Sequence, residues 1–234
     1  MTPAIPRSSA AVFAIIKEIT TLGWVEIPPQ FQGTGAPGNT LEYLANVVEN
    51  NKDSPDLEDW ELKFHGGKAS LVTLFHYDPE PRGILKSMVD RFGWDDGQGR
   101  ISFRHTIRGS SPRGFQIINE NDRIIVRNIN DLSFEPFWQH NTLLGQMGAK
   151  LRRLIVVHGN YDTAKRLVRY NSAVGYWDVN LTGFCAAIEN GIVCVDFDCR
   201  TSQGRGTTLR NHGTKFRISI NDIGLLYSNS QCII

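Results

Sequence analysis

The chain has 234 residues, of which 41% are hydrophobic and 21% are charged, and its formal net charge is +1 at pH 7. This length and apolar content can bury a substantial core in one compact unit or in two lobes. No apolar run approaches the roughly 18 residues that a membrane span needs, so we expect no membrane partner.

The pattern of apolar residues predicts an α/β protein with a mixed sheet. Helical spacing is found near residues 9–22, 39–50, 83–92 and 178–190. Strand-like runs are found at residues 59–64, 70–76, 101–108, 114–119, 122–128, 153–158, 192–199 and 214–220. The polar residues 119–122 predict a hairpin turn. Lys17 and Glu18 directly follow the first apolar segment, and no cleavage site is present, so this segment is interpreted as a helix and not as a signal peptide.

Residues 54–64, SPDLEDWELKF, place Asp56, Glu61 and Lys63 within eight positions. Side chains on a strand alternate between its two faces, so Glu61 and Lys63 should project to one side and their apolar neighbours to the other. Mg²⁺ prefers oxygen ligands, which Asp56 and Glu61 could supply, and a bound metal lowers the pKa of water so that it can attack a phosphodiester. Lys63 could orient that water or stabilise the transition state. A solvated strand face with an ion pair would show the same motif.

The predicted helix at residues 39–50 offers a further carboxylate. Asn39 suits a helix start, and Glu42 follows it by three residues, as in a capping box. Glu42 also lies 14 residues before Asp56, so it could instead belong to the same site as the motif.

Basic residues are concentrated in the second half of the chain. Residues 1–99 hold 14 acids and 8 bases, whereas residues 100–234 hold 10 acids and 17 bases. The most basic segment, residues 199–221, contains no acid and includes Arg200, Arg205, Arg210, Lys215 and Arg217. Such a segment can neutralise DNA phosphates, and an Arg can bind guanine through O6 and N7.

We expect base contacts from residues 65–77, 100–113 and 200–217. In the strand at 192–199, Cys194, Asp196 and Asp198 should share one face, with Arg200 just beyond it. A carboxylate can accept a hydrogen bond from cytosine N4. For any one of these residues, a surface salt bridge is nevertheless the favoured role.

The remaining cysteines and histidines indicate no further metal site. Cys185, Cys194, Cys199 and Cys232 have no CxxC spacing and suit buried thiols in a reducing cytoplasm. The histidines at positions 65, 105, 140 and 158 have no spacing typical of metal ligands.

Four blocks together carry a resemblance: GNTLE at residues 38–42, PD-x4-ELK at 55–63, ASLVTLFH at 69–76 and NHGTKFRI at 211–218. In this order they resemble the MvaI/BcnI family of restriction endonucleases, which share the MutH-like version of the PD-(D/E)xK fold. The resemblance implies a single MutH-like unit over residues 1–234, with two lobes around a DNA cleft. A catalytic lobe would be centred on residues 38–92 and a DNA-recognition lobe on residues 100–130 and 192–220, with the chain re-crossing between them.

The resemblance implies a prokaryotic, cytoplasmic type II restriction endonuclease. Such an enzyme would act as a monomer on double-stranded DNA at a short CC-N-GG pseudopalindrome, nicking one strand at a time. Mg²⁺ would be the cofactor, with Mn²⁺ substituting and Ca²⁺ supporting binding without cleavage. A cognate DNA methyltransferase is implied as a functional partner.

The family's site residues can be carried over by position. Glu42, Asp56, Glu61 and Lys63 match the catalytic residues, and Asp56 and Glu61 match the metal ligands. His76 and Lys215 match positions that approach the central base pair. His76 looks like the BcnI branch, whereas the NHGTKF block is closer to the MvaI branch and Lys215 fits neither, so the central pair is left open. The predicted DNA-binding residues are His76, Arg200, Arg210, His212, Lys215 and Arg217, although His212 before Gly213 could be a turn residue.

Two other functions remain open. A MutH-like mismatch-repair nicking endonuclease would keep the fold and the site but depend on helper proteins. A DNA-binding module without catalysis is expected if the cluster of Asp56, Glu61 and Lys63 is a structural ion-pair network.

Overall fold

The structure is a computed structural model that describes residues 9–45, 57, 59–67 and 71–234. The chain forms two compact units, each made from separate stretches of sequence. The first unit comprises Met1–Val72, Gly148–Asn180 and Ile223–Ile234, and the second comprises Thr73–Met147 and Leu181–Asp222. The predicted lobe centred on residues 38–92 therefore spans parts of both units.

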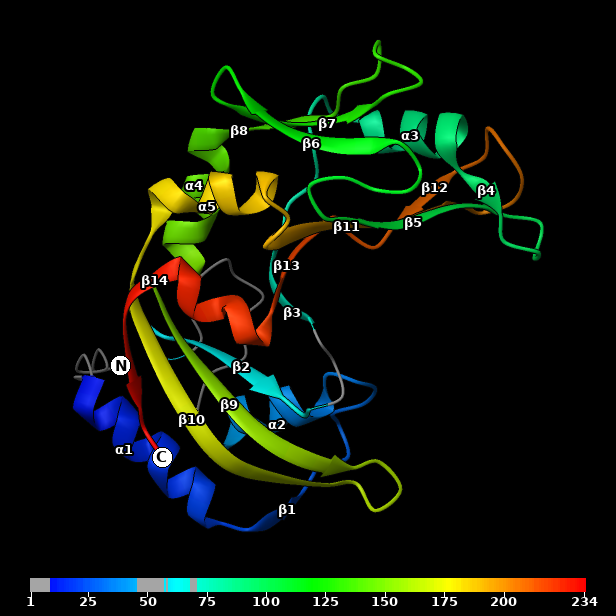
Figure 1. Ribbon diagram of the computed structural model, residues 1–234. Helices are drawn as coiled ribbons and strands as arrows, with labels where there is room; N and C mark the ends of the chain where they lie inside the picture. Colours follow the sequence, from blue (N-terminus) through cyan, green and yellow to red (C-terminus); the bar gives the residue numbers. More distant parts are fainter. Residues whose placement is uncertain (1–8, 46–56, 58, 68–70) are drawn as a thin grey trace, which may run out of the picture. The chain divides into compact units, whose positions relative to one another are not determined.

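The first unit is a five-stranded sheet covered on one face by two helices (Figure 1). The strand order is β1-β10-β9-β2, and β14 also pairs with β10. The elements of this unit are α1 (Ser9–Thr21), β1 (Trp24–Glu26), α2 (Ala36–Leu44), β2 (Glu61–His65), β9 (Arg153–Asp162), β10 (Leu167–Val179) and β14 (Tyr227–Cys232). The 3-10 helix η1 (Ile220–Leu226) leads into β14. Strand β2 runs parallel to β9, whereas the other pairs are antiparallel.

Apolar residues of α1 and α2 pack on the face of this sheet that carries the apolar side of β2. Val12 and Ile16 of α1 are fully buried, and they belong to one cluster with Leu62 of β2 and with Ile155 and Val157 of β9. Burying such side chains contributes about 1.5–3 kcal/mol each. This packing fixes which face of β2 points into the core.

The second unit contains two sheets. The larger sheet has the order β3-β13-β11-β5-β4, with β12 paired to β11, and the smaller sheet has the order β6-β7-β8. Its strands are β3 (Leu71–His76), β4 (Trp94–Asp95), β5 (Ile101–Ile107), β6 (Phe115–Glu120), β7 (Arg123–Asn128), β8 (Phe137–Gln139), β11 (Val193–Thr201), β12 (Leu209–Asn211) and β13 (Lys215–Ser219). Helix α3 (Ile84–Phe92) packs against β5 and β11, whereas α5 (Leu181–Glu189) packs against β11, β6 and β7. Helix α4 (His140–Lys150) follows β8.

The predicted α/β class and most of the predicted elements are confirmed. The turn at residues 119–122 joins β6 to β7, with Asn121 and Asp122 at φ values of 50° and 58°, as a tight type I′ hairpin requires. The predicted start of the second helix at Asn39 is wrong. Helix α2 begins at Ala36 after Gly35, and no side chain caps it, so Asn39 and Glu42 do not form a capping box.

Candidate functional site

Glu61 and Lys63 lie side by side on β2, on the face opposite the apolar cluster. The Nζ atom of Lys63 forms an ion pair with Oε1 of Glu61, and the Glu61 side chain is only 2% exposed. Leu62 lies in the core and Phe64 packs against it. The predicted alternation is therefore confirmed, and it places a nearly buried carboxylate beside a partly exposed ammonium group.

Strand β9 supplies an apolar floor next to this pair. Glu61 is in register with Leu154, and Lys63 is in register with Val156, and both of these β9 residues are fully buried. The same register sets His65 beside His158, with ring centroids 5.5 Å apart in an edge-to-face arrangement. Burial and the neighbouring His65 lower the pKa of His158. His158 was not among the sequence candidates, because only the parallel pairing of β2 with β9 places it near Lys63.

Glu42 lies on α2, which packs against β2 in the same unit. The helix is tied to the sheet by the hydroxyl group of Tyr170, which donates a 2.8 Å hydrogen bond to the carbonyl oxygen of Pro37. Burial raises the pKa of Tyr170, and the negative charge of Glu42 raises it further. Glu42 is therefore held in the same unit as Glu61 and Lys63, on a helix that packs on the apolar face of β2 and not on the face that carries their side chains.

Asp56, the other predicted metal ligand, lies outside the described residues. Within the part of the chain that the structure describes, no group of three or more His, Cys, Asp or Glu residues could hold a metal. Glu61 nevertheless fits the role, because its carboxylate is a hard oxygen donor held in a nearly buried position beside a cation. The predicted ligand set of Asp56 and Glu61 thus stays a prediction.

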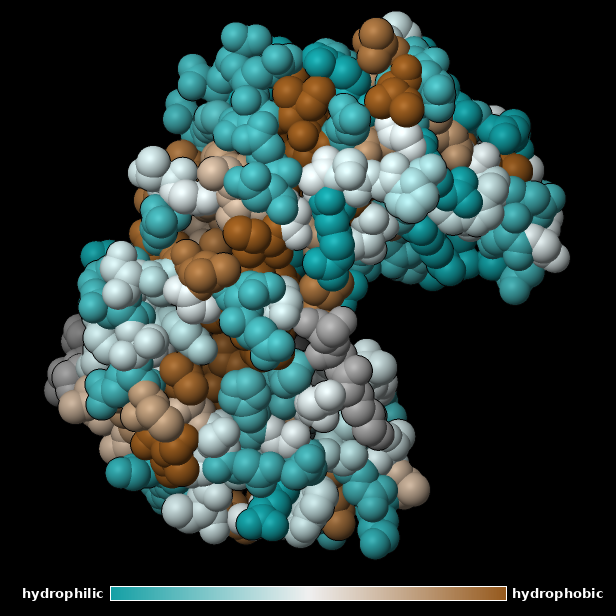
Figure 2. Space-filling view, in the orientation of Figure 1, coloured by the Kyte–Doolittle hydropathy of each residue, from teal (hydrophilic) through white to brown (hydrophobic). Residues whose placement is uncertain are grey.

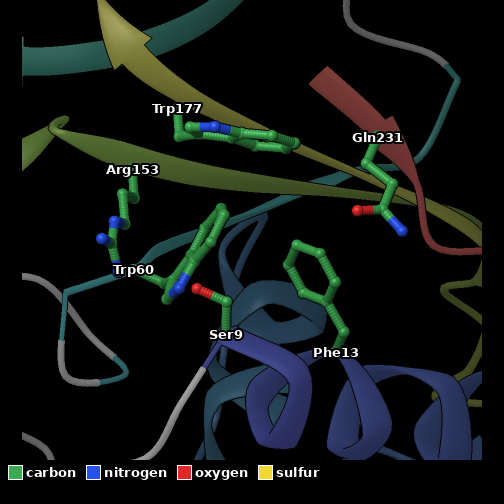
Figure 3. A pocket seen from close by; sticks show the side chains of 6 residues that line it. All are labelled: Ser9, Phe13, Trp60, Arg153, Trp177 and Gln231. Atoms are coloured by element: carbon green, nitrogen blue, oxygen red, sulfur yellow. The ribbon is translucent and has the colours of Figure 1, made fainter. Parts of the chain in front are cut away.

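An aromatic pocket of about 170 Å³ lies where α1 packs on the sheet of the first unit, and none of the described residues that line it carries a carboxylate (Figure 3). Phe13 and Trp60 are in edge-to-face contact at 5.1 Å, and Trp60 meets Trp177 at 6.5 Å between centroids. The residues that line the pocket are Ser9, Phe13, Trp60, Arg153, Trp177 and Gln231. This pocket belongs to the packing of α1 on the sheet and is separate from the Glu61 side of β2.

The second unit carries a cluster of charges on β5, β11 and β13, which line an open hollow of about 440 Å³. Figure 2 shows hydrophilic residues gathered over the end of this unit that holds β5 and β12. We call this cluster the β11 charged surface, and its members are Arg104, Asp196, Asp198, Lys215 and Arg217. The expected common face of Asp196 and Asp198 is confirmed, since Val193, Val195 and Phe197 on the other face are buried.

Every acid of the β11 charged surface is paired with a base of the same surface. Lys215 donates to Oδ2 of Asp198 at 3.0 Å, and Arg217 donates to Oδ2 of Asp196 at 3.1 Å. Arg104 lies 3.2 Å from Oδ1 of Asp198. Burial by itself would raise the pKa of Asp198, but the hydrogen bond and charge of Lys215, with smaller effects of Arg104 and His212, lower it overall. These salt bridges are the role that the sequence favoured for the two acids.

Arg104 is a member of this surface that sequence reasoning did not single out. It lies within the residues 100–113 from which base contacts were expected, and it is the direct cross-strand partner of Asp198. A spacing rule could not find it, because the two residues are far apart in sequence and meet only when β5 pairs with β11.

The remaining predicted DNA-binding residues lie near the same strands. Arg200 of β11 is the cross-strand partner of the exposed Arg210 of β12. Partial burial and then the positive charges of Arg100, Arg104 and Arg210 lower the pKa of Arg200, so this end of the sheet is strongly basic.

His76 and His212 are both exposed. His76 is the last residue of β3, and His212 lies in the short connection between β12 and β13. Gly213 has φ of 83°, and a Cβ atom there would lie 3.0 Å from Cδ2 of His76. Asp78 fixes this turn by accepting hydrogen bonds from the Thr214 amide at 2.9 Å and from the Asn211 side chain. His212 thus sits in an ordered turn, as the alternative interpretation required, and its side chain remains open to solvent.

Arg205, from the same basic segment, has a structural role. Its guanidinium group donates to the backbone carbonyl oxygens of Asp90 and Gly93. These carbonyls lie at the C-terminal end of α3, where basic groups are favourable. Positive charge in the segment 199–221 is therefore divided between a helix cap and a surface.

The cysteines and the other histidines lie at separate places in the described residues. Cys185, Cys194 and Cys199 are buried, but Cys232 is exposed, so the expectation of four buried thiols is wrong for Cys232. Its position on β14, whose last residues face solvent, explains the difference. His105 lies 2.9 Å from the hydroxyl group of Ser111 and His140 lies near Asp122. None of the helices in the described ranges has the length and apolar character needed to cross a membrane.

Comparisons with known proteins agree on one family. A family model described as the MvaI/BcnI restriction endonuclease family matches residues 13–227. The solved structure "Restriction endonuclease MvaI-cognate DNA substrate complex" is 27% identical, with a TM-score of 0.76, and the match covers 97% of this chain and all of that one. A second structure, "Restriction endonuclease MvaI in the absence of DNA", is 26% identical with a TM-score of 0.53, and the match covers 99% of this chain and all of that one. A search of curated proteins gave no match. The chain belongs to the MvaI/BcnI restriction endonuclease family.

Proposed function

We propose that this protein is a Mg²⁺-dependent type II restriction endonuclease that hydrolyses double-stranded DNA. The observation that carries the proposal is the Glu61–Lys63 pair on β2, in a chain whose family and structural relatives are restriction endonucleases. We further infer a monomer that cuts a CC-N-GG site one strand at a time, in a cytoplasm where a methyltransferase protects the host's own sites.

In this proposal the first unit performs the hydrolysis. Glu61 and Asp56 would hold Mg²⁺, which when bound supplies a Lewis acid and lowers the pKa of its water. Lys63 would orient the attacking water and stabilise the negative charge that develops on the phosphate, and the removal of one such stabilising group typically costs about 10²–10³ in rate. Glu42, on the adjacent α2, would complete the set of acids. The buried floor of Leu154 and Val156 keeps bulk water off one side of the pair.

The second unit would read the DNA. The β11 charged surface offers both hydrogen-bond donors and acceptors, which suits G·C pairs, because guanine presents O6 and N7 as acceptors and cytosine presents N4 as a donor. Arg200 and Arg210, on the neighbouring basic end, would contact phosphates or guanines. The exposed His76 is proposed to approach the central base pair with Lys215, and the exposed His212 is proposed to contact DNA.

Run-off sequencing of plasmid digested by the pure protein tests the proposal. We expect linear DNA with defined ends at a G·C-flanked site, in Mg²⁺ or Mn²⁺, and binding without cleavage in Ca²⁺. The variant Asp56→Ala should bind DNA in Ca²⁺ but not cut it in Mg²⁺.

The same assay separates the alternatives. Nicked plasmid that is cut only when helper proteins are added would favour a mismatch-repair nickase. Intact plasmid in every metal, with a clear shift of DNA in a gel, would leave a DNA-binding module. Full activity of Asp56→Ala would contradict the assigned site.

A further inference from the structure

The β11 charged surface combines three bases with two acids, although a surface that only gripped the DNA backbone would need no acids. Arg104 and Lys215 contact Asp198, and Arg217 contacts Asp196. The acids are themselves held in place, because the hydroxyl group of Thr106 donates a 2.7 Å hydrogen bond to Oδ1 of Asp196. Each cation of this surface therefore already has an anionic partner within the protein.

The strand register makes this pairing systematic. Asp196 is the cross-strand partner of Lys215 and of Thr106, and Asp198 is the cross-strand partner of Arg104. The acids lie on the central strand β11, with bases on the strands at both sides. Their side chains are only 15% and 28% exposed, so the pairs are screened less than fully exposed ones.

We propose that Asp196 and Asp198 are specificity-determining residues that keep the bases of this surface from binding the phosphates of non-target DNA. The proposal rests on the proposed function, since it assumes that this surface faces DNA.

The reason lies in what each partner offers. A phosphate is only an acceptor, so it could replace a carboxylate at Arg217 or Lys215, but it would leave that carboxylate unpaired and facing another negative charge. A G·C pair offers acceptors on guanine and a donor on cytosine, so it can satisfy the base and the acid together. Replacing the carboxylate partner of Arg217 or Lys215 by a DNA phosphate is therefore unfavourable in free energy. Replacing it by guanine, while cytosine pairs with the freed carboxylate, is close to neutral.

The test measures the affinity for a duplex made only of A·T pairs, which carries phosphates but no G·C pair. Asp196→Asn and Asp198→Asn keep the shape of the side chain and remove its charge. The matched control is Asp122→Asn in the same unit, because the Asp122 side chain is 99% exposed in the β6–β7 turn and lies outside this surface. Affinity is followed by fluorescence anisotropy without divalent ions at several salt concentrations.

Each Asp→Asn variant of the surface should bind the A·T duplex more tightly than the wild type. One additional phosphate contact steepens the slope of log K against log salt by about 0.9. The affinity of the variant relative to the wild type should therefore rise about eightfold when the salt concentration falls from 1 M to 0.1 M. Asp122→Asn should leave the slope unchanged. If the acids only read cytosine, their removal would leave A·T binding unchanged, and that result would overturn the proposal.

A double variant tests whether the released base makes the new contact. Because Asp196 is paired with Arg217, adding Arg217→Gln to Asp196→Asn should abolish the gain in affinity for the A·T duplex without leaving an unpaired carboxylate. If the double variant keeps the full gain of Asp196→Asn, Arg217 is not the base that Asp196 withholds, and the proposal is refuted. Cleavage of plasmid by the wild type is measured in parallel, so that failure of the proposed function, with no cleavage and no binding to any duplex, is distinguished from failure of this inference alone.

Discussion

Replacing Lys63 with Met removes the ammonium group that faces Glu61 while keeping a side chain of similar length. Loss of one partner of a buried ion pair costs roughly 3–5 kcal/mol, because the remaining charge stays buried without compensation. The Lys63 side chain is 24% exposed, so water relieves part of this cost, and we expect a loss of about 3 kcal/mol at most. For a chain of this size, that loss lowers Tm by about 6–12 °C.

The assay is thermal or urea unfolding without divalent ions, together with the cleavage rate in Mg²⁺. Glu61→Gln should destabilise less than Lys63→Met, because the charge left behind on Lys63 can reach solvent. The double variant should recover most of the stability lost in Lys63→Met, whereas cleavage should stay at least about 10²-fold slow in all three. The reasoning is refuted if Lys63→Met unfolds like the wild type, or if the two substitutions are additive in stability.

Three further predictions concern residues away from this pair. Arg205→Ala should lower the free energy of unfolding by about 1 kcal/mol, because hydrogen bonds at the end of α3 are lost. The same substitution should leave the DNA affinity unchanged, and weaker DNA binding would contradict the capping role of Arg205. In the native protein, a thiol reagent should modify Cys232 alone, because the other three cysteines are buried. Burial raises the pKa of these thiols, to about 11 for Cys185 and about 12 for Cys199. Labelling of a second cysteine in the folded protein would be inconsistent with this packing. The pKa of Asp198 is lower in the folded protein than its unfolded value of about 3.9. Its contribution to stability is therefore complete above about pH 3.9 and is lost as the pH falls through the folded pKa. Urea titrations at several pH values should show that Asp198→Asn weakens this loss of stability in acid, and an unchanged pH profile would oppose the assignment.

Much of strand β2 could be predicted from local sequence, because the alternation of its side chains between two faces is a local property. A period of two residues is enough to place Glu61 and Lys63 on one face and Leu62 on the other. The turn at Asn121 and Asp122 was equally local, since few residues tolerate positive φ. The start of α2 could not be placed in this way, because Asn39 offers a good cap in isolation, whereas the helix begins earlier, at Ala36 and Pro37, which are both buried.

What sequence reasoning missed depends on pairing between distant strands. The 13-residue strand β10 was not predicted, because Asn171 and Gly175 interrupt its apolar pattern, and its length is stabilised by pairing with β9, β1 and β14. Helix α4 contains Gly145 and Gly148, which lower its intrinsic helix propensity. Arg104 lies beside Asp198, and His158 beside His65, only because of the register in which their strands pair. A single sequence carries no signal of such register.

The parallel pairing of β2 with β9 also limits how this protein can be engineered. These two strands are neighbours in the sheet, yet the stretch Thr73–Met147 of the second unit lies between them in the chain. Neither unit is therefore a contiguous cassette that could be cloned alone or swapped with a relative by a single crossover. A chimera that exchanged one unit would need several junctions, at the places where the chain passes from one unit to the other. A single junction at any one of these places would separate strands that belong to the same sheet.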